Sequence, residues 1–302
     1  MSATLPQLKL KTLLGHYPIT RALRDGVLVP ETFSFDFADV KTPNRAFKRA
    51  VRELEFDIPE LALVTFFQAK AFGKPLSLIP AVVGAGRFQH HCLVYNVERG
   101  PRITVAQLAG KRIGIRAHSQ TTVTWVRGVL QQEYGVPLDQ VRWVTFEDGH
   151  LAESPDTPGY ERAPAGTKAV DLLLAGELDA AIIGTDLPDD PRLAAVLPDP
   201  HAAARAWGER HKMVPINHMV AMRTELMHEH PEVVRELYAL LSQSKALLHA
   251  ANPPAQDLTP FGVEANRSAL ELLLGYTHQQ GLIPRAYAVD ELFTDFNQAM
   301  QA

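Results

Sequence analysis

The stretch Met213-Val-Pro-Ile-Asn-His-Met-Val-Ala-Met-Arg223 decides how the two halves of this 302-residue chain are joined. It is a mainly apolar run interrupted by Asn217 and His218, and such a run is typical of a buried strand. A second apolar stretch covers residues 91–97. Two strands of this kind, one before and one after an α/β segment, predict a chain that crosses from one lobe to another and returns.

Strand and helix patterns alternate along both halves of the chain. Strand patterns cover residues 8–14, 33–37, 58–64, 76–83, 112–115, 141–146 and 179–184. Helical patterns cover residues 17–25, 43–53, 123–134 and 169–178, and a long segment that begins at Pro231. We therefore expect a two-lobed α/β fold with two mixed or parallel sheets, flanking helices and a hinge of two crossover strands. Lobe 1 is predicted to contain residues 1–95 and 213–302, and lobe 2 residues 96–212, with a ligand cleft between them.

The composition excludes several classes of function. With 46% hydrophobic residues the chain can bury a sizeable core, and a net charge of −4 without long runs of one sign gives no footprint for nucleic acid or an anionic membrane. No apolar stretch approaches the roughly 20 residues needed to cross a bilayer. Residues 1–11 lack the segments of a secretory signal, so we expect a cytoplasmic protein. The charge pattern leaves a small molecule or another protein as its partner. The sequence does not reveal the oligomeric state, and a homo-oligomer is compatible with it.

The turn Arg116-Ala-His-Ser-Gln-Thr-Thr122 lies between a predicted strand and a predicted helix. Unpaired backbone amides at the start of a helix favour an anion such as a carboxylate, and the hydroxyl groups of Ser119, Thr121 and Thr122 would add donors around Gln120. The alternative is that Ser119 or Thr121 only caps the helix.

The turn Gly15-His16-Tyr17 also lies between a predicted strand and a predicted helix, as the turn at residues 116–122 does. Because ligands in α/β sheets bind at the carboxyl ends of strands, His16 and Tyr17 are expected to face the cleft. The alternative is that His16 is an exposed turn residue.

Several histidines lie on or beside predicted strands. His90 and His91 are adjacent on a predicted strand, so their side chains should point to opposite faces, and His91 is the one we expect at the cleft. His218 lies on the return strand, and a core histidine is the alternative for each of the three. Cys92, the single cysteine, is expected to be a small core residue.

The segment Phe146-Glu147-Asp-Gly-His150 ends another predicted strand with two carboxylates and an imidazole. These groups suit acid/base chemistry, although a solvated loop would have the same composition. No two histidines have the spacing that places two metal ligands on one face, and no phosphate-binding or dinucleotide motif is present. We expect neither a metal nor a cofactor. Because histidines are abundant, a metal-dependent hydrolase or lyase is the least favoured of the three functions considered.

Three blocks of sequence resemble the 4,5-dihydroxyphthalate decarboxylases. The blocks are Trp125–Val136, Val214–Arg223 and Pro260–Arg267 with Tyr276–Leu282, and the resemblance extends over nearly the whole chain. It implies a fold similar to the type II periplasmic solute-binding proteins. It also implies a cofactor-independent carboxy-lyase of aromatic acid degradation, which releases carbon dioxide from a hydroxylated, phthalate-like acid, as in the conversion of 4,5-dihydroxyphthalate to protocatechuate.

The implied reaction assigns roles to the candidate residues. The start of the helix at Ser119–Thr122, with Arg87, would hold the carboxylate that the substrate retains. His218 or His91 would donate a proton to the ring carbon, and Glu147 or His150 would accept the phenolic proton. His218 lies within one of the resembling blocks.

The chain departs from the family at two predicted ligand contacts. The family has an acidic and a basic residue where the first strand meets the first helix, whereas this chain has Gly15-His-Tyr-Pro-Ile19, and Gly86–His91 matches loosely. A related aromatic acid is therefore nearly as suitable a substrate as 4,5-dihydroxyphthalate. The runner-up function is a solute-binding or ligand-sensing protein for a small aromatic or carboxylate ligand, because one fold serves many functions.

Overall fold

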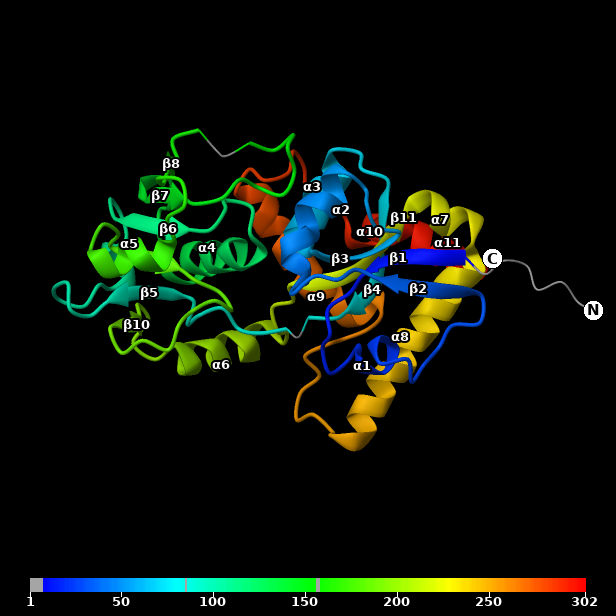
Figure 1. Ribbon diagram of the computed structural model, residues 1–302. Coiled ribbons are helices and arrows are strands. Elements are labelled where there is room, and N and C mark those ends of the chain that lie inside the picture. Colours follow the sequence, from blue (N-terminus) through cyan, green and yellow to red (C-terminus); the bar gives the residue numbers. More distant parts are fainter. Residues whose placement is uncertain (1–7, 85, 156–157) are drawn as a thin grey trace, which may run out of the picture. The chain divides into compact units, whose positions relative to one another are not determined.

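A computed structural model of the chain describes residues 8–84, 86–155 and 158–302, which divide into two compact units (Figure 1). The first unit contains the described residues of Met1–Gly86 together with Ile216–Leu274 and Arg285–Ala302. The second contains Arg87–Pro215 and Gly275–Pro284. Three segments predicted in lobe 1, residues 87–95, 213–215 and 275–284, fall in the second unit. Residues 1–7, part of the segment read for an export signal, lie outside the described residues.

The first unit is built on a five-stranded sheet of order β2-β1-β3-β11-β4. Its strands are β1 (Leu8–Leu13), β2 (Phe33–Phe37), β3 (Ile58–Ala62), β4 (Leu76–Val82) and β11 (His218–Arg223). β1 pairs in parallel with β2 and β3, whereas β11 runs antiparallel to both β3 and β4. A strand from late in the chain therefore lies between two early ones, with His218 opposite Ala62 and Val220 opposite Glu60.

Helices cover both faces of this sheet. They are α1 (Arg21–Arg24), α2 (Phe47–Arg52) after the 3₁₀ turn η1 (Pro43–Ala46), α3 (Leu63–Ala71), α7 (Thr224–Glu229), α8 (Pro231–Ala251), α9 (Val263–Gln279), α10 (Val289–Leu292) and α11 (Thr294–Gln301). Figure 1 shows α2 and α3 on one side of the sheet and α1 and α8 on the other. The apolar stripe of α8, including Val234, Leu237 and Leu241, packs in one core with Ile58 and Val220 of the sheet.

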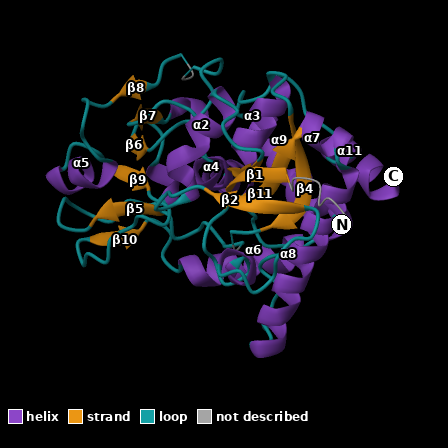
Figure 2. Cartoon of the chain, turned by 45° about the vertical axis from the view of Figure 1, so that its right-hand side comes forward, coloured by secondary structure: helices purple, strands orange, loops and turns teal. Residues whose placement is uncertain are grey.

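The second unit has a six-stranded sheet of order β10-β5-β9-β6-β7-β8 (Figure 2). Its strands are β5 (Leu93–Asn96), β6 (Arg112–Ile115), β7 (Arg142–Thr145), β8 (Glu161–Arg162), β9 (Ala180–Ile182) and β10 (Leu193–Ala195). β6 is parallel to β7 and β9, and β5 is antiparallel to β9 and β10. Both sheets are thus mixed, as predicted.

The helices of the second unit are α4 (Thr121–Tyr134), α5 (Ala169–Ala175) and α6 (Pro200–His211), with 3₁₀ turns η2 (Val105–Gln107) and η3 (Leu138–Gln140). α4 ends where Gly135 adopts a left-handed conformation at φ 65°, which glycine reaches without strain. Among the described residues, no helix is both long and apolar enough to span a bilayer.

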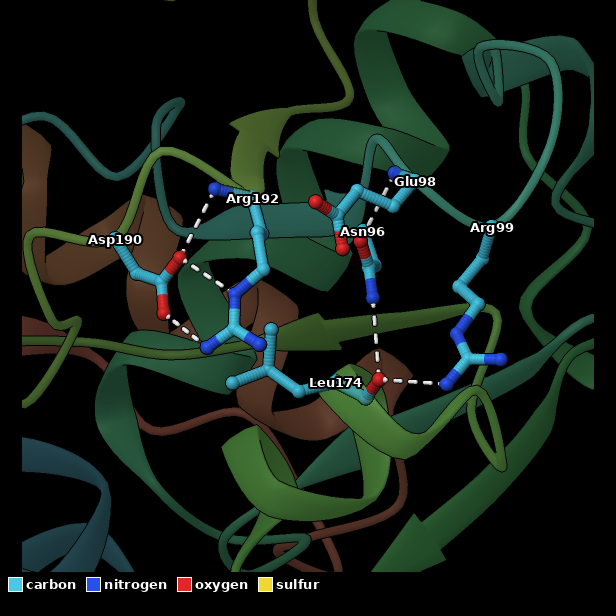
Figure 3. A network of polar contacts seen from close by, with 6 residues as sticks. All are labelled: Asn96, Glu98, Arg99, Leu174, Asp190 and Arg192. Carbon is cyan, nitrogen blue, oxygen red and sulfur yellow. Dashed lines mark hydrogen bonds and ion pairs between the residues drawn. The ribbon is translucent and has the colours of Figure 1, made fainter.

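The C-terminal end of α5 is held by side chains from β5 and the loop after it (Figure 3). Asn96 Nδ2 and Arg99 Nη2 both donate to the carbonyl oxygen of Leu174, each at 3.2 Å. Carbonyl groups in the last turn of a helix lack intrahelical partners, and positive charge is favoured there. Figure 3 also shows the ion pair between Asp190 and Arg192, at 2.7 Å. The two hydrogen bonds to Leu174 fix the end of α5 to β5 and the loop after it.

Three local predictions differ from the structure. The return strand predicted over residues 213–223 begins only at His218, because residues 213–217 form no strand. Residues 58–64 were predicted as one strand, but β3 ends at Ala62 and α3 begins at Leu63. The described residues Leu63–Ala69 of α3 are all buried, so the helix has no polar face and therefore no helical periodicity to recognise. His90 and His91 lie in the turn before β5 and not on a strand, which corrects the argument from strand alternation.

The contact between Gly128 and Tyr276 allows a test of packing in the second unit. A Cβ atom at Gly128, inside α4, would lie 2.1 Å from Cδ2 of the buried Tyr276 ring. Alanine favours a helix by about 1 kcal/mol over glycine, but overpacking costs about 1–3 kcal/mol. We expect Gly128→Ala to lower the free energy of unfolding, measured in urea, by about 1–2 kcal/mol.

Gly275 of α9 is the matched control, because a Cβ atom there would meet no atom within 4 Å. Gly275→Ala should raise the free energy of unfolding by up to about 1 kcal/mol. Equal effects of the two substitutions would contradict the packing of Tyr276 over α4.

Candidate functional site

The loop after β1 places Tyr17 against the sheet of the first unit. Thr20 Oγ1 accepts a hydrogen bond from the Tyr17 backbone N–H at 2.9 Å and donates one to the Gly15 carbonyl oxygen at 2.5 Å. A Cβ atom at position 15 would lie 2.4 Å from the Tyr17 ring, so the ring can cover the loop only because residue 15 is glycine. The loop therefore holds the Tyr17 hydroxyl in one direction.

Tyr17 points at Glu60 of β3, whose side chain is fully buried. Glu60 Oε1 accepts from Tyr17 Oη and from His218 Nδ1, both at 2.7 Å, and Oε2 accepts from the Gly15 backbone N–H at 2.9 Å. Burying a carboxylate is costly unless its oxygens receive hydrogen bonds, and here three donors supply them. Burial, together with the Glu60 charge, raises the pKa of Tyr17 above its ordinary value, so the phenol keeps the proton that it donates.

His218 contributes a partly exposed imidazole to this cluster. Nδ1 faces Glu60, while Nε2 makes no hydrogen bond with a described residue, and 24% of the side chain is exposed. The Phe47 ring meets the imidazole edge-on at 5.3 Å, and Gly84 approaches it so closely that a Cβ atom would lie 3.4 Å from Nδ1. A carboxylate on Nδ1 fixes the orientation and the tautomer of the ring. The pair can therefore accept or donate a proton at Nε2.

His16 does not join this cluster. Its Nε2 lies 2.7 Å from Asp25 Oδ1, and about half of each side chain is exposed. Of the two residues predicted in this turn, the structure places Tyr17 at the Glu60–His218 pair and His16 on the surface.

In the second unit, the predicted anion-binding turn leads into α4. Ser119, Thr121 and Thr122 are each at most 5% exposed. The N-cap residue is the half-buried Gln120, not Ser119 or Thr121, and its side chain makes no capping hydrogen bond. Simple capping by Ser119 or Thr121 is therefore not what the structure shows.

Arg87 supplies a positive charge beside this turn. Its Nη2 donates to Thr122 Oγ1 at 3.4 Å, and Gly184 leaves it room, since a Cβ atom there would lie 3.1 Å from Nη2. No carboxylate among the described residues forms an ion pair with Arg87. A cation, buried hydroxyl groups and a helix N-terminus are the features that hold a carboxylate.

His90 and His91 have different surroundings. His90 is 6% exposed and packs against the Trp207 ring, with centroids 6.1 Å apart. His91 is half-buried, its Nε2 lies 3.7 Å from Cys92 Sγ, and burial followed by the charge of Arg87 lowers its pKa. Cys92 is buried and its pKa is raised to about 11, so the thiol keeps its proton and is a poor nucleophile.

The loop after β7 lies against the anion-binding turn. A Cβ atom at Gly149 would lie 3.1 Å from Ser119 Oγ, and His150 is 8% exposed. Glu147 is exposed, with Oε2 3.8 Å from Arg116 Nε. The structure thus brings the loop at 147–150 close to residues 116–122.

Within residues 8–84, 86–155 and 158–302, no group of three His, Cys, Asp or Glu side chains is arranged to hold a metal ion.

Glu60, which joins Gly15, Tyr17 and His218 in the first unit, is not among the residues predicted from the sequence. It is the one charged residue in Ile58-Pro-Glu-Leu-Ala-Leu-Val64. A buried charged residue requires hydrogen-bonding or charged partners. A single glutamate inside an apolar strand is therefore the sequence signal that could have indicated this cluster.

Comparison with solved structures defines the class of fold. The chain is similar to the alkanesulfonate-binding protein SsuA from Xanthomonas axonopodis pv. citri, with a TM-score of 0.56 and 12% identity over 96% of this chain and 99% of that one. The aliphatic sulphonate-binding SsuA from Escherichia coli gives a TM-score of 0.56 at 13% identity, over 95% and 92% of the two chains. The chain therefore has the periplasmic-binding-protein fold.

Comparison with curated sequences identifies the family. The chain is 29% identical to a 4,5-dihydroxyphthalate decarboxylase from Comamonas testosteroni, over 95% of this chain and 96% of the relative. It is 30% identical to a 4,5-dihydroxyphthalate decarboxylase from Pseudomonas putida, over 67% of this chain and 81% of the relative. No protein-family model matches the chain. The chain belongs to the 4,5-dihydroxyphthalate decarboxylase family.

The burial of His90 predicts a dependence of stability on pH. Burial lowers the pKa of His90 to about 4, whereas an unfolded histidine has a pKa near 6.5. Between these values the unfolded chain binds a proton that the folded chain does not, so the free energy of unfolding falls as the pH is lowered through this window. The loss should reach about 2 kcal/mol at pH 5.

His90→Gln removes the titrating group. Between pH 7 and pH 5, the free energy of unfolding of this variant, measured in urea, should therefore fall by about 2 kcal/mol less than that of the wild type. The exposed His278 is the control, and His278→Gln should retain the wild-type loss. If His90→Gln also retains it, His90 is protonated in the folded protein near pH 6.5.

Proposed function

We propose that this protein catalyses the cofactor-independent decarboxylation of a hydroxylated aromatic dicarboxylate of the 4,5-dihydroxyphthalate type. The observation that carries the proposal is the Glu60–His218 pair, which places a proton-transferring imidazole on a buried carboxylate. Two relatives that cover most of the chain are named for this activity.

The reaction replaces one carboxylate on the ring by a proton. A hydroxyl group para to that carboxylate is deprotonated and increases the electron density at the ring carbon. The carbon accepts a proton, and its bond to the carboxylate then breaks to release carbon dioxide. Such a reaction requires a base for the phenol, an acid for the carbon and a fixed seat for the second carboxylate.

His218 is proposed as the acid. With Nδ1 held by Glu60, the protonated ring presents its second proton on Nε2. Tyr17 and the Gly15 backbone N–H fix Glu60, so the carboxylate keeps its orientation as the imidazole changes charge. Decarboxylation consumes a proton at carbon, and solvent can restore it to His218 because part of this side chain is exposed.

The second unit is proposed to bind the retained carboxylate. The start of α4 offers Ser119, Thr121 and Thr122, and Arg87 supplies the positive charge. His91, held close to Arg87 and uncharged at neutral pH by its lowered pKa, is proposed as a second ligand contact. Glu147 or His150, on the loop after β7, is proposed to accept the phenolic proton.

A solute-binding or ligand-sensing function is the second candidate. The solved structures that resemble this chain include sulfonate-binding proteins, and an anion-binding turn serves binding as well as catalysis. A cytoplasmic location is part of the enzyme proposal, whereas export of the native chain would favour solute binding. The ligand itself, whichever function holds, is proposed to be a small aromatic carboxylate.

Replacement of His218 tests the catalytic proposal. His218→Ala should reduce carbon dioxide release from 4,5-dihydroxyphthalate by at least about 10²-fold, since general acid catalysis contributes this much. Because the carboxylate seat is unchanged, the ligand should still raise the melting temperature of the variant. Glu60→Gln should also reduce turnover, since an amide does not stabilise the imidazolium.

His228 is the matched control, since its Nε2 lies 2.8 Å from Asp295 Oδ1 in a second histidine–carboxylate pair of the same unit. His228→Ala should retain full turnover. Full turnover in His218→Ala would show that another group is the acid, and ligand binding to the wild type without carbon dioxide release would favour the solute-binding function.

A further inference from the structure

Arg127 is a buried cation behind the anion-binding turn that the sequence analysis did not single out. It lies in α4 and is 3% exposed. Its guanidinium lies over the rings of Trp143 and Tyr160, 5.1 and 5.7 Å from their centroids, and it hydrogen-bonds to Tyr160. No carboxylate among the described residues forms an ion pair with it, and its Nε is buried without a hydrogen-bond partner. A buried arginine normally has an anionic partner.

The guanidinium contacts the anion-binding turn through one peptide group. Arg127 Nη1 donates to the carbonyl oxygen of His118 at 3.3 Å. The peptide bond between His118 and Ser119 is planar and trans, so the Ser119 N–H points in the direction opposite to this carbonyl. That N–H is therefore directed away from Arg127.

Ser119 has donor capacity that the protein does not use. The residue is 3% exposed, yet neither its backbone N–H nor its hydroxyl group forms a hydrogen bond with a described residue. Its Oγ faces Gly149, where a Cβ atom would lie only 3.1 Å away. Buried polar groups are normally satisfied, so an unused pair of donors at the start of α4 points to a ligand that accepts both.

We propose that Arg127 is a positioning residue for the carboxylate-binding turn, an inference that rests on the proposed function. By holding the His118 carbonyl, it keeps the Ser119 N–H directed at the retained carboxylate of the substrate. A charged donor on the carbonyl also polarises the peptide and strengthens the N–H as a donor. Arg127 thus acts on the anion through the peptide and does not touch the substrate.

Calorimetric binding of phthalate, a dicarboxylate without hydroxyl groups, measures this seat independently of turnover. Arg127→Met keeps the apolar stem and removes the charge, and it should raise the Kd for phthalate by about tenfold or more. Arg127→Lys keeps a charge but loses the planar fork, so its Kd should lie between those of the wild type and Arg127→Met. In both variants KM for 4,5-dihydroxyphthalate should rise by a larger factor than kcat falls.

Arg24 provides the matched control, because it is a partly buried arginine of the first unit that lies 4.5 Å from the Phe37 ring centroid. Arg24→Lys should bind phthalate as the wild type does. A merely structural role for Arg127 would lower the melting temperature of its variants without changing Kd or KM in the folded protein.

The outcomes separate this inference from the proposed function. Weakened phthalate binding in Arg127→Lys supports the inference even if the wild type releases no carbon dioxide, a result that would overturn the decarboxylase proposal alone. Unchanged Kd and KM in a folded Arg127→Lys overturn the inference and leave the decarboxylase intact. If Arg127→Met does not fold, the Kd and KM of Arg127→Lys test the inference. If the wild type does not bind phthalate, the inference is overturned.

Discussion

The burial of the Glu60 carboxylate is the constraint on which the first unit depends. A carboxylate inside a sheet requires donors, and these come from places far apart in the chain. Gly15 and Tyr17 lie 45 and 43 residues before it, and His218 lies 158 residues after it. The insertion of β11 between β3 and β4 brings His218 into place, and the absence of a side chain at residue 15 lets the Tyr17 ring cover its loop. The order of the strands and the conformation of the loop after β1 thus both serve to surround the Glu60 carboxylate with donors.

The second unit has the opposite electrostatic character around the start of α4. Arg87 and Arg127 are both close to this turn, and neither forms an ion pair with a carboxylate in the described parts of the chain. Two cations without internal counter-charges are stabilised when an anion binds, and this is the charge that an aromatic dicarboxylate carries. The imidazole on a buried carboxylate in the first unit, and the two cations beside the start of α4 in the second, are the features on which the proposed function rests.

Local signals in the sequence predicted local structure well. The strand at Arg112–Ile115, the end of a helix at Tyr134-Gly135 and the start of one at Pro231 are all confirmed, because each depends on neighbouring residues. The helix α3 is not predicted, since Leu63–Ala69 are all buried and show no amphipathic period. The role of Glu60 depends on strand order across 158 residues, which periodicity does not encode. His218 was singled out from the sequence, but its partner became visible only in the fold.

The identity of the product distinguishes a decarboxylase from a binding protein. If 4,5-dihydroxyphthalate is incubated with the wild-type protein in deuterium oxide, we expect one carbon dioxide for each substrate consumed. We also expect protocatechuate that carries one deuterium at the ring position vacated by the carboxylate, which proton NMR detects. Saturable binding of the substrate, with no carbon dioxide and no deuterium in the recovered aromatic acid, would contradict the claim that this protein is a decarboxylase.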